Sequence, residues 1–414
     1  MPGIHRERPG ADAIAPATDA PAVDVGDGVW LSPGLSNSYL ITTSDGRVVV
    51  NSGMGFEGPL HRAKYDAVDA SPIRAVILTQ GHYDHVGGLP VLVDEGTDLV
   101  AQANHGVWRN DNQRLEAFRS RNSAFAWIDA ILAAMEHTRA LGVEAAPAEI
   151  PEPTVLVGER LELTVGDREL VLIATPGGET FDSLVIWLPQ TRTLLSGNLT
   201  GPLFGHVPNL VTIRGDRYRD ALTYIDSLEI VKELRPERLL TGHFDPVEGA
   251  DRIAEEVEAM QEAMQWVHDR TVDGMNAGDD VWELMCTIRV PDHLDVGEGY
   301  GKTPWNVRAI WENYAGWFHH RSTTELYGVA PLAVAPDLVA AAAGADPLVA
   351  AAQAHLDGGR PVEALQLTDV VLAVERGHAG AKAVALAAHE ALLAETSNFW
   401  ESAWLRRAAE KLAR

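Results

Sequence analysis

Side chains that commonly bind metal ions cluster in one short segment of the chain, GHYDHVGG at positions 81–88. His82 and His85 offer imidazole ligands and Asp84 offers a carboxylate, a combination that suits Zn, Fe or Mn. The segment directly follows the apolar run IRAVILTQ, which has the length of a strand, and its glycines allow a tight turn. A loop at the end of a strand would therefore present these side chains together, as a metal site requires.

Two later loops offer further ligands, again directly after predicted strands. TPGGE ends at Glu179, and TGH ends at His243. Cys286 is the only cysteine, which excludes a disulfide framework and leaves histidine and carboxylate as the ligand types. Because three such loops are improbable by chance, we expect a metal site. The alternatives are a hydrogen-bonded loop cluster without metal and a Glu179 that only caps a turn.

The composition excludes several other classes of protein. No apolar run approaches the ~20 residues of a membrane-spanning helix. Residues 1–25 lack the apolar stretch of a secretory signal, so we expect a flexible N-terminal tail, no membrane association and a cytoplasmic location. The formal net charge of −26 disfavours nucleic acid as a partner. A small molecule is the expected partner, and an anionic one would need arginines at the site.

The elements that position these loops are expected to form two domains, since 414 residues exceed the ~250 to 300 at which one core stops growing. Runs typical of strands dominate up to Gly249: VWLSP, NSYLITT, GRVVVNSG, IRAVILTQ, TDLVAQANH, ELTVGD, ELVLIATPGG, SLVIWLP, TLLSGN and ERLLTGH. Asn110 to Gly142 has helical spacing, with aromatic residues that either roof a pocket or pack in a core. The pattern predicts a β-rich sandwich with helices outside, spanning 26–249.

Beyond Gly249 the strands vanish and amphipathic, Ala-rich segments follow, such as ADRIAEEVEAMQEAMQWVHDRT and NVRAIWENYAGWFHH. Breaks at DGGRP and ERGHAG separate segments that we interpret as helical hairpins. The sequence therefore predicts an all-α domain over 250–414.

Four motifs occur in an order that resembles bacterial primary and secondary alkylsulfatases: TPGGE, WLPQ, NLVTIRG and GHFDP. The segment NVRAIWENYAGWF is similar to the signature of that family's dimerisation domain, so the resemblance covers about 28–414. The family's lipid-carrier-like third domain has no counterpart in this sequence. The resemblance implies an α+β fold, with a metallo-β-lactamase αββα sandwich followed by an all-α dimerisation domain that builds a homodimer.

The resemblance also implies two metal positions, the first of which is altered here. In the family this metal is held by two histidines and a glutamate, which map to Gln80, His82 and Glu179, so glutamine replaces one histidine. A glutamate that bridges the two metals in the family falls on Asn198, a neutral amide. Both changes weaken the expected binding of a first metal.

The second metal position is complete. Its family ligands are an aspartate and two histidines, which map to Asp84, His85 and His243. We therefore expect one or two divalent ions, with Zn first and Fe or Mn as alternatives.

An anion site is implied by the motif NLVTIRG, whose asparagine and arginine bind sulfate in the family. They map to Asn209 and Arg214, which would steady negative charge on a substrate. The alternative is that Arg214 only pairs with a neighbouring carboxylate, Asp216 or Asp220.

The family's general acid, a histidine at the start of the NV segment of the dimerisation domain, is replaced here by Trp305. Because indole cannot protonate a leaving group as imidazolium does, we expect poor cleavage of linear alkyl sulfates. His206 is a candidate substitute ligand or acid.

These residues favour a metal-dependent hydrolase in which activated water attacks a sulfate or related ester. Asp84, Asn209 and Arg214 are the expected catalytic residues, with Asp84 also a candidate base. A first alternative is a mono- or dinuclear non-heme iron oxygenase or oxidoreductase on the same scaffold, produced by the changes at Gln80 and Asn198. A second is a degenerate binding protein without catalysis. Metal content separates the three.

Overall fold

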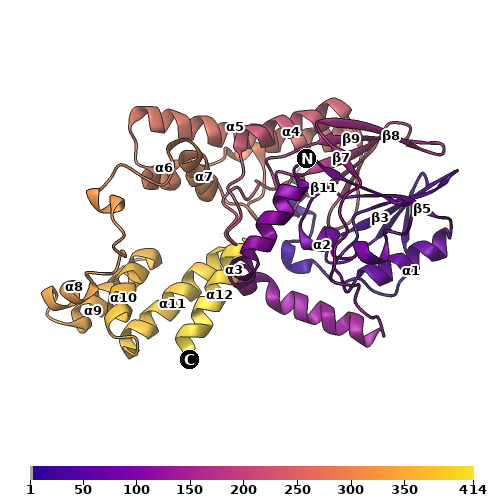
Figure 1. The fold of residues 1–414 in the computed structure, drawn as a ribbon. Helices are drawn as coiled ribbons and strands as arrows, with labels where there is room; N and C mark the ends of the chain where they lie inside the picture. The colour runs from indigo at the N-terminus through magenta and orange to yellow at the C-terminus, as the bar shows by residue number, and fades with distance from the viewer. Residues whose placement is uncertain (1–2) are drawn as a thin grey trace. The chain divides into compact units, whose positions relative to one another are not determined.

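The computed structural model describes residues 3–414, which form two compact units. The first unit extends to Tyr314 and contains both β-sheets, and the second unit, Ala315–Arg414, is helical. Figure 1 shows the strands gathered in the first unit and the last part of the chain, from orange to yellow, built of helices. The predicted α+β fold, with sheets first and an all-helical region last, is confirmed.

Seven strands form the first sheet in chain order. They are β1 (Val23–Gly26), β2 (Val29–Ser32), β3 (Ser38–Thr43), β4 (Gly46–Val50), β5 (Ile73–Ile77), β6 (Asp98–Gln102) and β7 (Val155–Val157). The first four pair antiparallel, as the opening strand-like runs suggest, and β4 to β7 pair parallel. The parallel connections contain α1 (Gly58–Val68), α2 (Tyr83–Val86), η3 (Leu89–Val91) and α3 (His105–Ala140).

Six strands form the second sheet, in the spatial order β13-β12-β11-β10-β9-β8. They are β8 (Arg160–Val165), β9 (Arg168–Ala174), β10 (Leu184–Leu188), β11 (Thr193–Gly197), β12 (Arg238–Thr241) and β13 (Val247–Glu248). β11 and β12 pair parallel because α4 (Ala221–Leu234) connects them. Asp220 caps the start of this helix by accepting a hydrogen bond from the Thr223 amide, a common role for aspartate at a helix N-terminus.

The main hydrophobic core lies between the two sheets. Its fully buried side chains come from alternate positions of strands in both sheets, among them Ile41, Val48, Ile77, Leu172 and Ile186. The intervening positions of the first sheet face the other way, and Leu40, Val49 and Val76 pack there with Tyr65 of α1. Because β3 to β5 are buried on both faces, their sequences read as continuous apolar runs. Helices on the outside of two packed sheets complete the expected αββα sandwich.

The division between the units differs from the domain boundary expected at Gly249. Helices α5 (Ala250–Ala277), α6 (Val281–Thr287) and nearly all of α7 (Thr303–Ala315) belong to the first unit. α5 packs along α4, with its apolar face buried at Ile253, Val257, Met260 and Met264. The change in composition at Gly249 therefore marks a change of secondary structure, while the packing of α5 keeps it with the sheets.

The second unit consists of η5 (Thr323–Leu326) and helices α8 (Ala335–Ala341), α9 (Ala345–Asp357), α10 (Pro361–Val374), α11 (Ala379–Glu395) and α12 (Phe399–Ala413). Consecutive helices from α9 to α12 pack against each other, as expected of helical hairpins. Small residues fill the space between them, among them Ala352, Ala364, Ala381 and Ala388. The core of this unit therefore depends on close approach of helix backbones.

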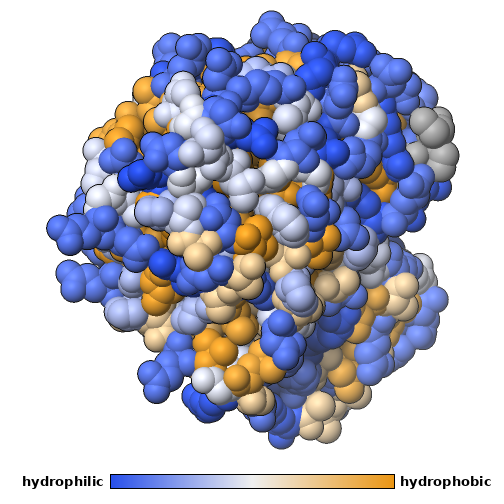
Figure 2. Space-filling model, turned by 90° about the vertical axis from the view of Figure 1, so that its right-hand side faces the viewer, coloured by the Kyte–Doolittle hydropathy of each residue, from blue (hydrophilic) through white to orange (hydrophobic). Residues whose placement is uncertain are grey.

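The face of the molecule in Figure 2 is mostly hydrophilic, with hydrophobic side chains in scattered groups. Among residues 3–414, no single helix is long and apolar enough to cross a membrane. The bent pair α8 and α9, which meet at 91°, passes the same test of length and composition only when the two are taken together.

The N-terminal segment makes specific buried contacts instead of forming the flexible tail expected over 1–25. It contains the short helices η1 (Ile4–Arg6) and η2 (Ala11–Ala13). The Ile4 amide donates to Glu256 Oε1 at 2.8 Å, and the Ala17 amide donates to Glu57 Oε1 at 2.8 Å. Composition did not reveal this docking because carboxylates distant in the sequence anchor the segment.

Candidate metal centre

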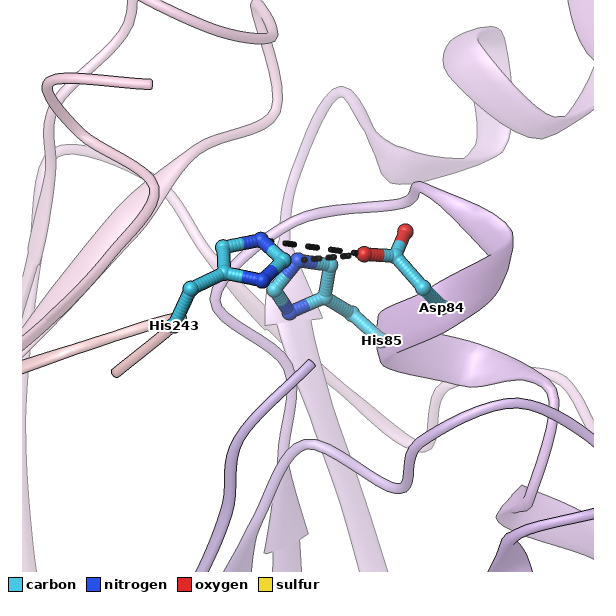
Figure 3. Close-up of side chains that lie close together, drawn as sticks. All are labelled: Asp84, His85 and His243. Carbon is cyan, nitrogen blue, oxygen red and sulfur yellow. Dashed lines mark ion pairs between the residues drawn. The ribbon is translucent and has the colours of Figure 1, made fainter. Parts of the chain in front are cut away.

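Asp84, His85 and His243 lie together at the ends of strands from the two sheets. Asp84 and His85 are in the short helix α2, which follows β5, and His243 follows β12. One ligand atom of each residue lies within 4.8 Å of those of the other two. Asp84 Oδ2 is 3.4 Å from His85 Nε2 and 3.9 Å from His243 Nε2, so one carboxylate oxygen faces both rings (Figure 3). We call these three residues the triad.

The buried nitrogens of the triad fit a divalent cation. Both ring nitrogens of His85 and Nδ1 of His243 are buried without a hydrogen-bond partner, whereas buried polar atoms are normally paired. Burial lowers the pKa of His243 to about 4, so its imidazole is neutral near pH 7. Neutral imidazole is the form that binds metal. The triad therefore matches the donor set that a zinc-like ion requires.

The loop after β12 approaches the loop after β11 closely. Asn198 Nδ2 lies 3.2 Å from His243 Nε2, and Asn198 Oδ1 is buried without a partner. A Cβ atom at Gly242 would lie 2.0 Å from that oxygen, so a larger residue there would require the Asn198 side chain to move. The Asn198 amide thus lies beside the triad. At this position the resemblance to alkylsulfatases implies a carboxylate that bridges two metals.

Gln80, His82 and Glu179, the residues expected at a first metal position, are also brought together. His82 Nδ1 lies 3.0 Å from Gln80 Nε2 and 3.2 Å from Glu179 Oε1. The other ring nitrogen, Nε2, lies 2.5 Å from Arg214 Nη2. Both nitrogens of His82 therefore contact neighbouring side chains, whereas neither nitrogen of His85 has a hydrogen-bond partner.

Arg214 belongs to a buried cluster of three arginines and two carboxylates, here called the ion-pair cluster. Arg214 Nε lies 2.7 Å from Asp216 Oδ2, and Arg119 Nε lies 3.0 Å from Asp216 Oδ1. Arg219 Nη1 lies 2.8 Å from Glu179 Oε2, and Arg214 Nη2 lies 3.7 Å from Glu179 Oε1. The pairing of Arg214 with Asp216 that the sequence left as an alternative is thus present, in a buried setting.

Burial and charge act in opposite directions on the carboxylates of this cluster. Burial raises the pKa of Glu179, although the guanidinium groups of Arg219 and Arg214 lower it. Burial would also raise the pKa of Asp216, but the Arg214 guanidinium outweighs it and holds that pKa below its usual value. The Asp216 carboxylate in turn raises the pKa of Arg214 despite burial, so Arg214 stays charged.

The triad and the ion-pair cluster border one cavity of about 880 Å³. Its polar wall contains, among others, His82, Asp84, Glu179, Asn198, Arg214 and His243. Apolar side chains line another part of it, namely Ile14, Leu35, Met54, Trp127 and Ile131. α3 contributes residues at helical spacing to this lining, so the aromatic segment predicted at 110–142 does border a pocket.

Three candidate residues do not line this cavity. Asn209 is buried, and its backbone carbonyl accepts a hydrogen bond from Arg219 Nη1 at 2.9 Å. His206 Nδ1 accepts one from the Gly299 amide at 2.9 Å, and its ring packs against His5. Trp305 lies half-buried on α7. The substrate contact expected of Asn209 and the ligand or acid role considered for His206 thus have no support in their positions, because neither residue borders the cavity.

Sequence reasoning missed three residues of the site, Arg119, Arg219 and Tyr300. Arg119 projects from α3 and Arg219 lies just before α4, so neither is part of a ligand motif. Tyr300 is buried, lines the cavity and follows α6 in the chain, close to the segment where the missing general acid was expected. Of these three residues, only Arg219 could have been found from the sequence, because it lies close to the NLVTIRG motif.

Two known families match the chain, consistent with this geometry. Residues 31–243 match the metallo-beta-lactamase superfamily, and residues 281–414 match the alkyl sulfatase dimerisation family. The chain is 26% identical over 340 residues to a linear primary-alkylsulfatase of a Pseudomonas species, covering 77% of this chain and 63% of that protein. It is 25% identical over 409 residues to the alkyl/aryl-sulfatase BDS1 of Saccharomyces cerevisiae, covering 93% of this chain and 62% of that protein. The chain thus spans less than two thirds of the length of these relatives.

A solved structure has the same fold. The stereoselective inverting sec-alkylsulfatase Pisa1 from a Pseudomonas species superposes with a TM-score of 0.82 at 22% sequence identity, covering 95% of this chain and 65% of that one. The family match includes β2 to β12 and every member of the triad. Since the matched residues span just over half of the chain and hold a metal-type donor set at the strand ends, the chain belongs to the metallo-beta-lactamase superfamily.

Proposed function

We propose that this chain is a metal-dependent hydrolase of sulfate esters or closely related esters. Membership of the metallo-beta-lactamase superfamily implies a divalent metal. The observation that carries the proposal is the triad, in which three buried ring nitrogens lack a hydrogen-bond partner and whose members Asp84 and His243 line the same cavity as Arg214. A divalent ion bound there would lower the pKa of a bound water to about 7, which supplies hydroxide near neutral pH.

The charge of the ion-pair cluster supports an anionic substrate. The cluster combines three guanidinium groups with two carboxylates, which leaves one positive charge in excess beside the cavity. The chain as a whole carries a formal net charge of −26, so an anion would be attracted only locally. Arg214 and Arg119 both line the cavity and are the proposed contacts for the anionic group of the ester.

The apolar part of the cavity supports a substrate with a hydrocarbon portion. Leu35, Met54 and Ile131 form a hydrophobic cluster with neighbouring side chains, and Trp127 adds an aromatic surface. Burial of each methylene group there would contribute about 0.8 kcal/mol. We therefore propose that the function of this chain is related to that of the alkylsulfatases, which the chain resembles over most of its length.

Zn is the proposed metal, with Fe or Mn as the alternatives. Two imidazoles and one carboxylate also suit non-heme iron, which is the observation that keeps an oxygenase as a second candidate. We prefer hydrolysis because the named relatives are sulfatases. Asp84 acts in this proposal first as a ligand, since Oδ2 faces both imidazoles.

We further propose a homodimer built by the helical part of the chain and a cytoplasmic location. The match of residues 281–414 to the alkyl sulfatase dimerisation family supports the dimer. Several large apolar side chains of the second unit are exposed in the single chain, among them Leu326, Tyr327, Val329, Leu332 and Leu338. Apolar groups of this kind are typical of surfaces that a partner covers.

The experiment that tests the function is a substrate panel with defined metals. The full chain is freed of metal, reloaded separately with Zn, Mn or Fe under controlled oxygen, and assayed on alkyl sulfates, phosphate esters, carboxylic esters and lactones. We expect metal-dependent hydrolysis of a sulfate or related ester. Dodecyl sulfate should react slowly, because Trp305 cannot supply the ~10²- to 10⁴-fold contribution of a general acid. No turnover of any ester by the metal-loaded chain would refute hydrolysis, and oxygen-dependent product with Fe would favour the second candidate.

A ligand variant connects activity to the triad. His243→Ala should lower metal affinity more than ~100-fold, since loss of a group that merely supports a ligand already costs about 10- to 100-fold. His293→Ala, at an exposed histidine away from the cavity, is the matched control and should bind metal as the wild type does. Equal affinity of the two variants would exclude His243 as a ligand.

A further inference from the structure

We infer that this chain binds a single metal ion, at the triad, and that the guanidinium group of Arg214 takes the place of a second one. Two groups of ligand-type side chains border the cavity, the triad and the pair His82 and Glu179. The inference deepens the proposed function, on which it rests for the ion at the triad. The second pair holds an imidazole and a carboxylate 3.2 Å apart, yet its surroundings do not fit a cation.

The hydrogen bonds of His82 leave no nitrogen available for a metal. Arg214 Nη2, at 2.5 Å from His82 Nε2, can only donate, because a guanidinium group has no acceptor. His82 Nε2 is therefore occupied by a cationic donor. Nδ1 lies 3.2 Å from Glu179 Oε1 and 3.0 Å from Gln80 Nε2. Both ring nitrogens of His82 thus face protein groups.

The carboxylate of Glu179 is also already neutralised. Arg219 Nη1 lies 2.8 Å from Oε2, and Arg214 Nη2 lies 3.7 Å from Oε1. The cluster already has one excess positive charge, so a divalent ion would raise the excess from one to three in a buried place. Uncompensated buried charge is strongly unfavourable, because the protein interior screens it far less than water does.

The surroundings of the triad, in contrast, do fit a cation. The unpartnered atoms His85 Nδ1, His85 Nε2 and His243 Nδ1 are buried, and among the described residues no arginine or lysine forms an ion pair or hydrogen bond with the triad's side chains. One cation there would meet ring nitrogens that face a carboxylate and a neutral amide and, in the described part of the chain, no protein cation. The two positions thus obtain their positive charge in different ways. The triad binds an exchangeable metal ion, and the position beside His82 and Glu179 holds the permanently charged guanidinium group of Arg214.

The amides Gln80 and Asn198 complete this arrangement. Gln80 Nε2 lies 3.0 Å from His82 Nδ1, and Asn198 Nδ2 lies 3.2 Å from His243 Nε2. Neither side chain carries the charge that would compensate a second divalent ion, and amides are not among the usual zinc ligands. The two neutral residues are therefore consistent with a one-metal site whose remaining positive charge is supplied by arginine.

Metal stoichiometry tests the inference without reference to activity. The full chain, freed of metal, is titrated with Zn²⁺ and with Mn²⁺ by calorimetry, the bound metal is counted by elemental analysis, and the Mn²⁺ form is examined by EPR. We expect one ion per chain and the EPR signal of isolated Mn²⁺. Two ions per chain of similar affinity, or the signal of an exchange-coupled pair, would overturn the inference and leave the proposed hydrolase intact. No bound ion would overturn both.

A pair of double variants tests the role of the guanidinium group itself. Arg214→Met combined with Gln80→His removes the cation and adds an imidazole, so a second ion should bind. Arg217→Met with Gln80→His is the matched control, because Arg217 is 61% exposed and pairs with Asp111 outside the cluster. The control should still bind one ion. If the first variant is folded by circular dichroism but binds only one ion, the Arg214 guanidinium is not what excludes the second. If it does not fold, the wild-type stoichiometry decides.

Discussion

His82 and His85 are three positions apart in the sequence, but their ring nitrogens have different surroundings. Those of His82 contact Arg214, Gln80 and Glu179, whereas those of His85 have no hydrogen-bond partner. His82 is the residue before the first turn of α2, and His85 lies within that turn. In our interpretation one histidine belongs to a structural network of charges and the other to a metal position.

Arg219→Met should destabilise the chain, because it removes the 2.8 Å contact to the buried Glu179 and the donor to the Asn209 carbonyl. Breaking one partner of a buried ion pair typically costs about 3 to 5 kcal/mol. Urea denaturation measures the change in the free energy of unfolding. Arg160→Met, whose pair with Glu162 is exposed at both partners, is the control and should cost at most about 1 kcal/mol. Equal effects of both variants would contradict the importance of the buried pair.

At the scale of elements, α3 gives the cavity two kinds of wall. Its first half contributes polar side chains such as Arg109, Glu116 and Arg119, and its second half contributes Trp127 and Ile131. The polar half lies near the metal loop, since the rings of Trp108 and His82 are 5.1 Å apart. A substrate with an anionic head and an apolar tail would therefore be oriented along this one helix.

Helix α1 carries a histidine that should make stability depend on pH. His61 is fully buried, its Nδ1 lies 2.6 Å from Ser32 Oγ, and burial lowers its pKa to about 3 from 6.5. Below pH 6.5 the unfolded chain takes up a proton that the folded chain does not, so stability is lost as pH falls toward 3. Above pH 6.5 this residue has no effect. At pH 5 the loss should be roughly 2 kcal/mol.

His61→Gln isolates this contribution, since glutamine can still bond to Ser32 but does not titrate in this range. Its free energy of unfolding should fall less than that of the wild type between pH 7 and pH 5. His293→Gln, at an exposed position, is the control and should follow the wild type. Parallel pH curves for all three proteins would show that His61 does not contribute.

At the scale of the whole molecule, the chain consists of a unit that holds the site and a helical unit whose exposed apolar side chains need an explanation. The N-terminal segment belongs to the first of these, because Ile14 lines the cavity and Ala17 is fixed by Glu57. Removal of this segment would therefore open the cavity, although composition alone predicted a flexible tail.

A homodimer is the expected state of the full chain. Static light scattering after size exclusion should give twice the monomer mass of 44.7 kDa at micromolar concentration. The physical reason is that a partner would cover the exposed apolar residues of the second unit, including Tyr327 and Val329. A mass of one chain over the whole elution peak would contradict the proposal.

The sequence alone predicted the sandwich, the helical region and the ligand loops. It could do so because strands and helices have characteristic periods and because Asp84, His85 and His243 directly follow predicted strands, whose ends meet at one edge of the fold. These are local signals. They hold even at low sequence identity, because burial on both faces of a strand requires a continuous apolar run whatever the exact residues are.

Only the tertiary structure decided which charges pair. Arg214 and His82 are separated by 132 positions, and the ion-pair cluster also draws Arg119 from a helix that carries no ligand motif. The same holds for the docked N-terminal segment and for Asn209, which lies away from the cavity. No periodic pattern records such contacts, because they depend on how distant loops approach one another. Packing and charge therefore place the guanidinium group of Arg214 at the position where the sequence predicted a first metal.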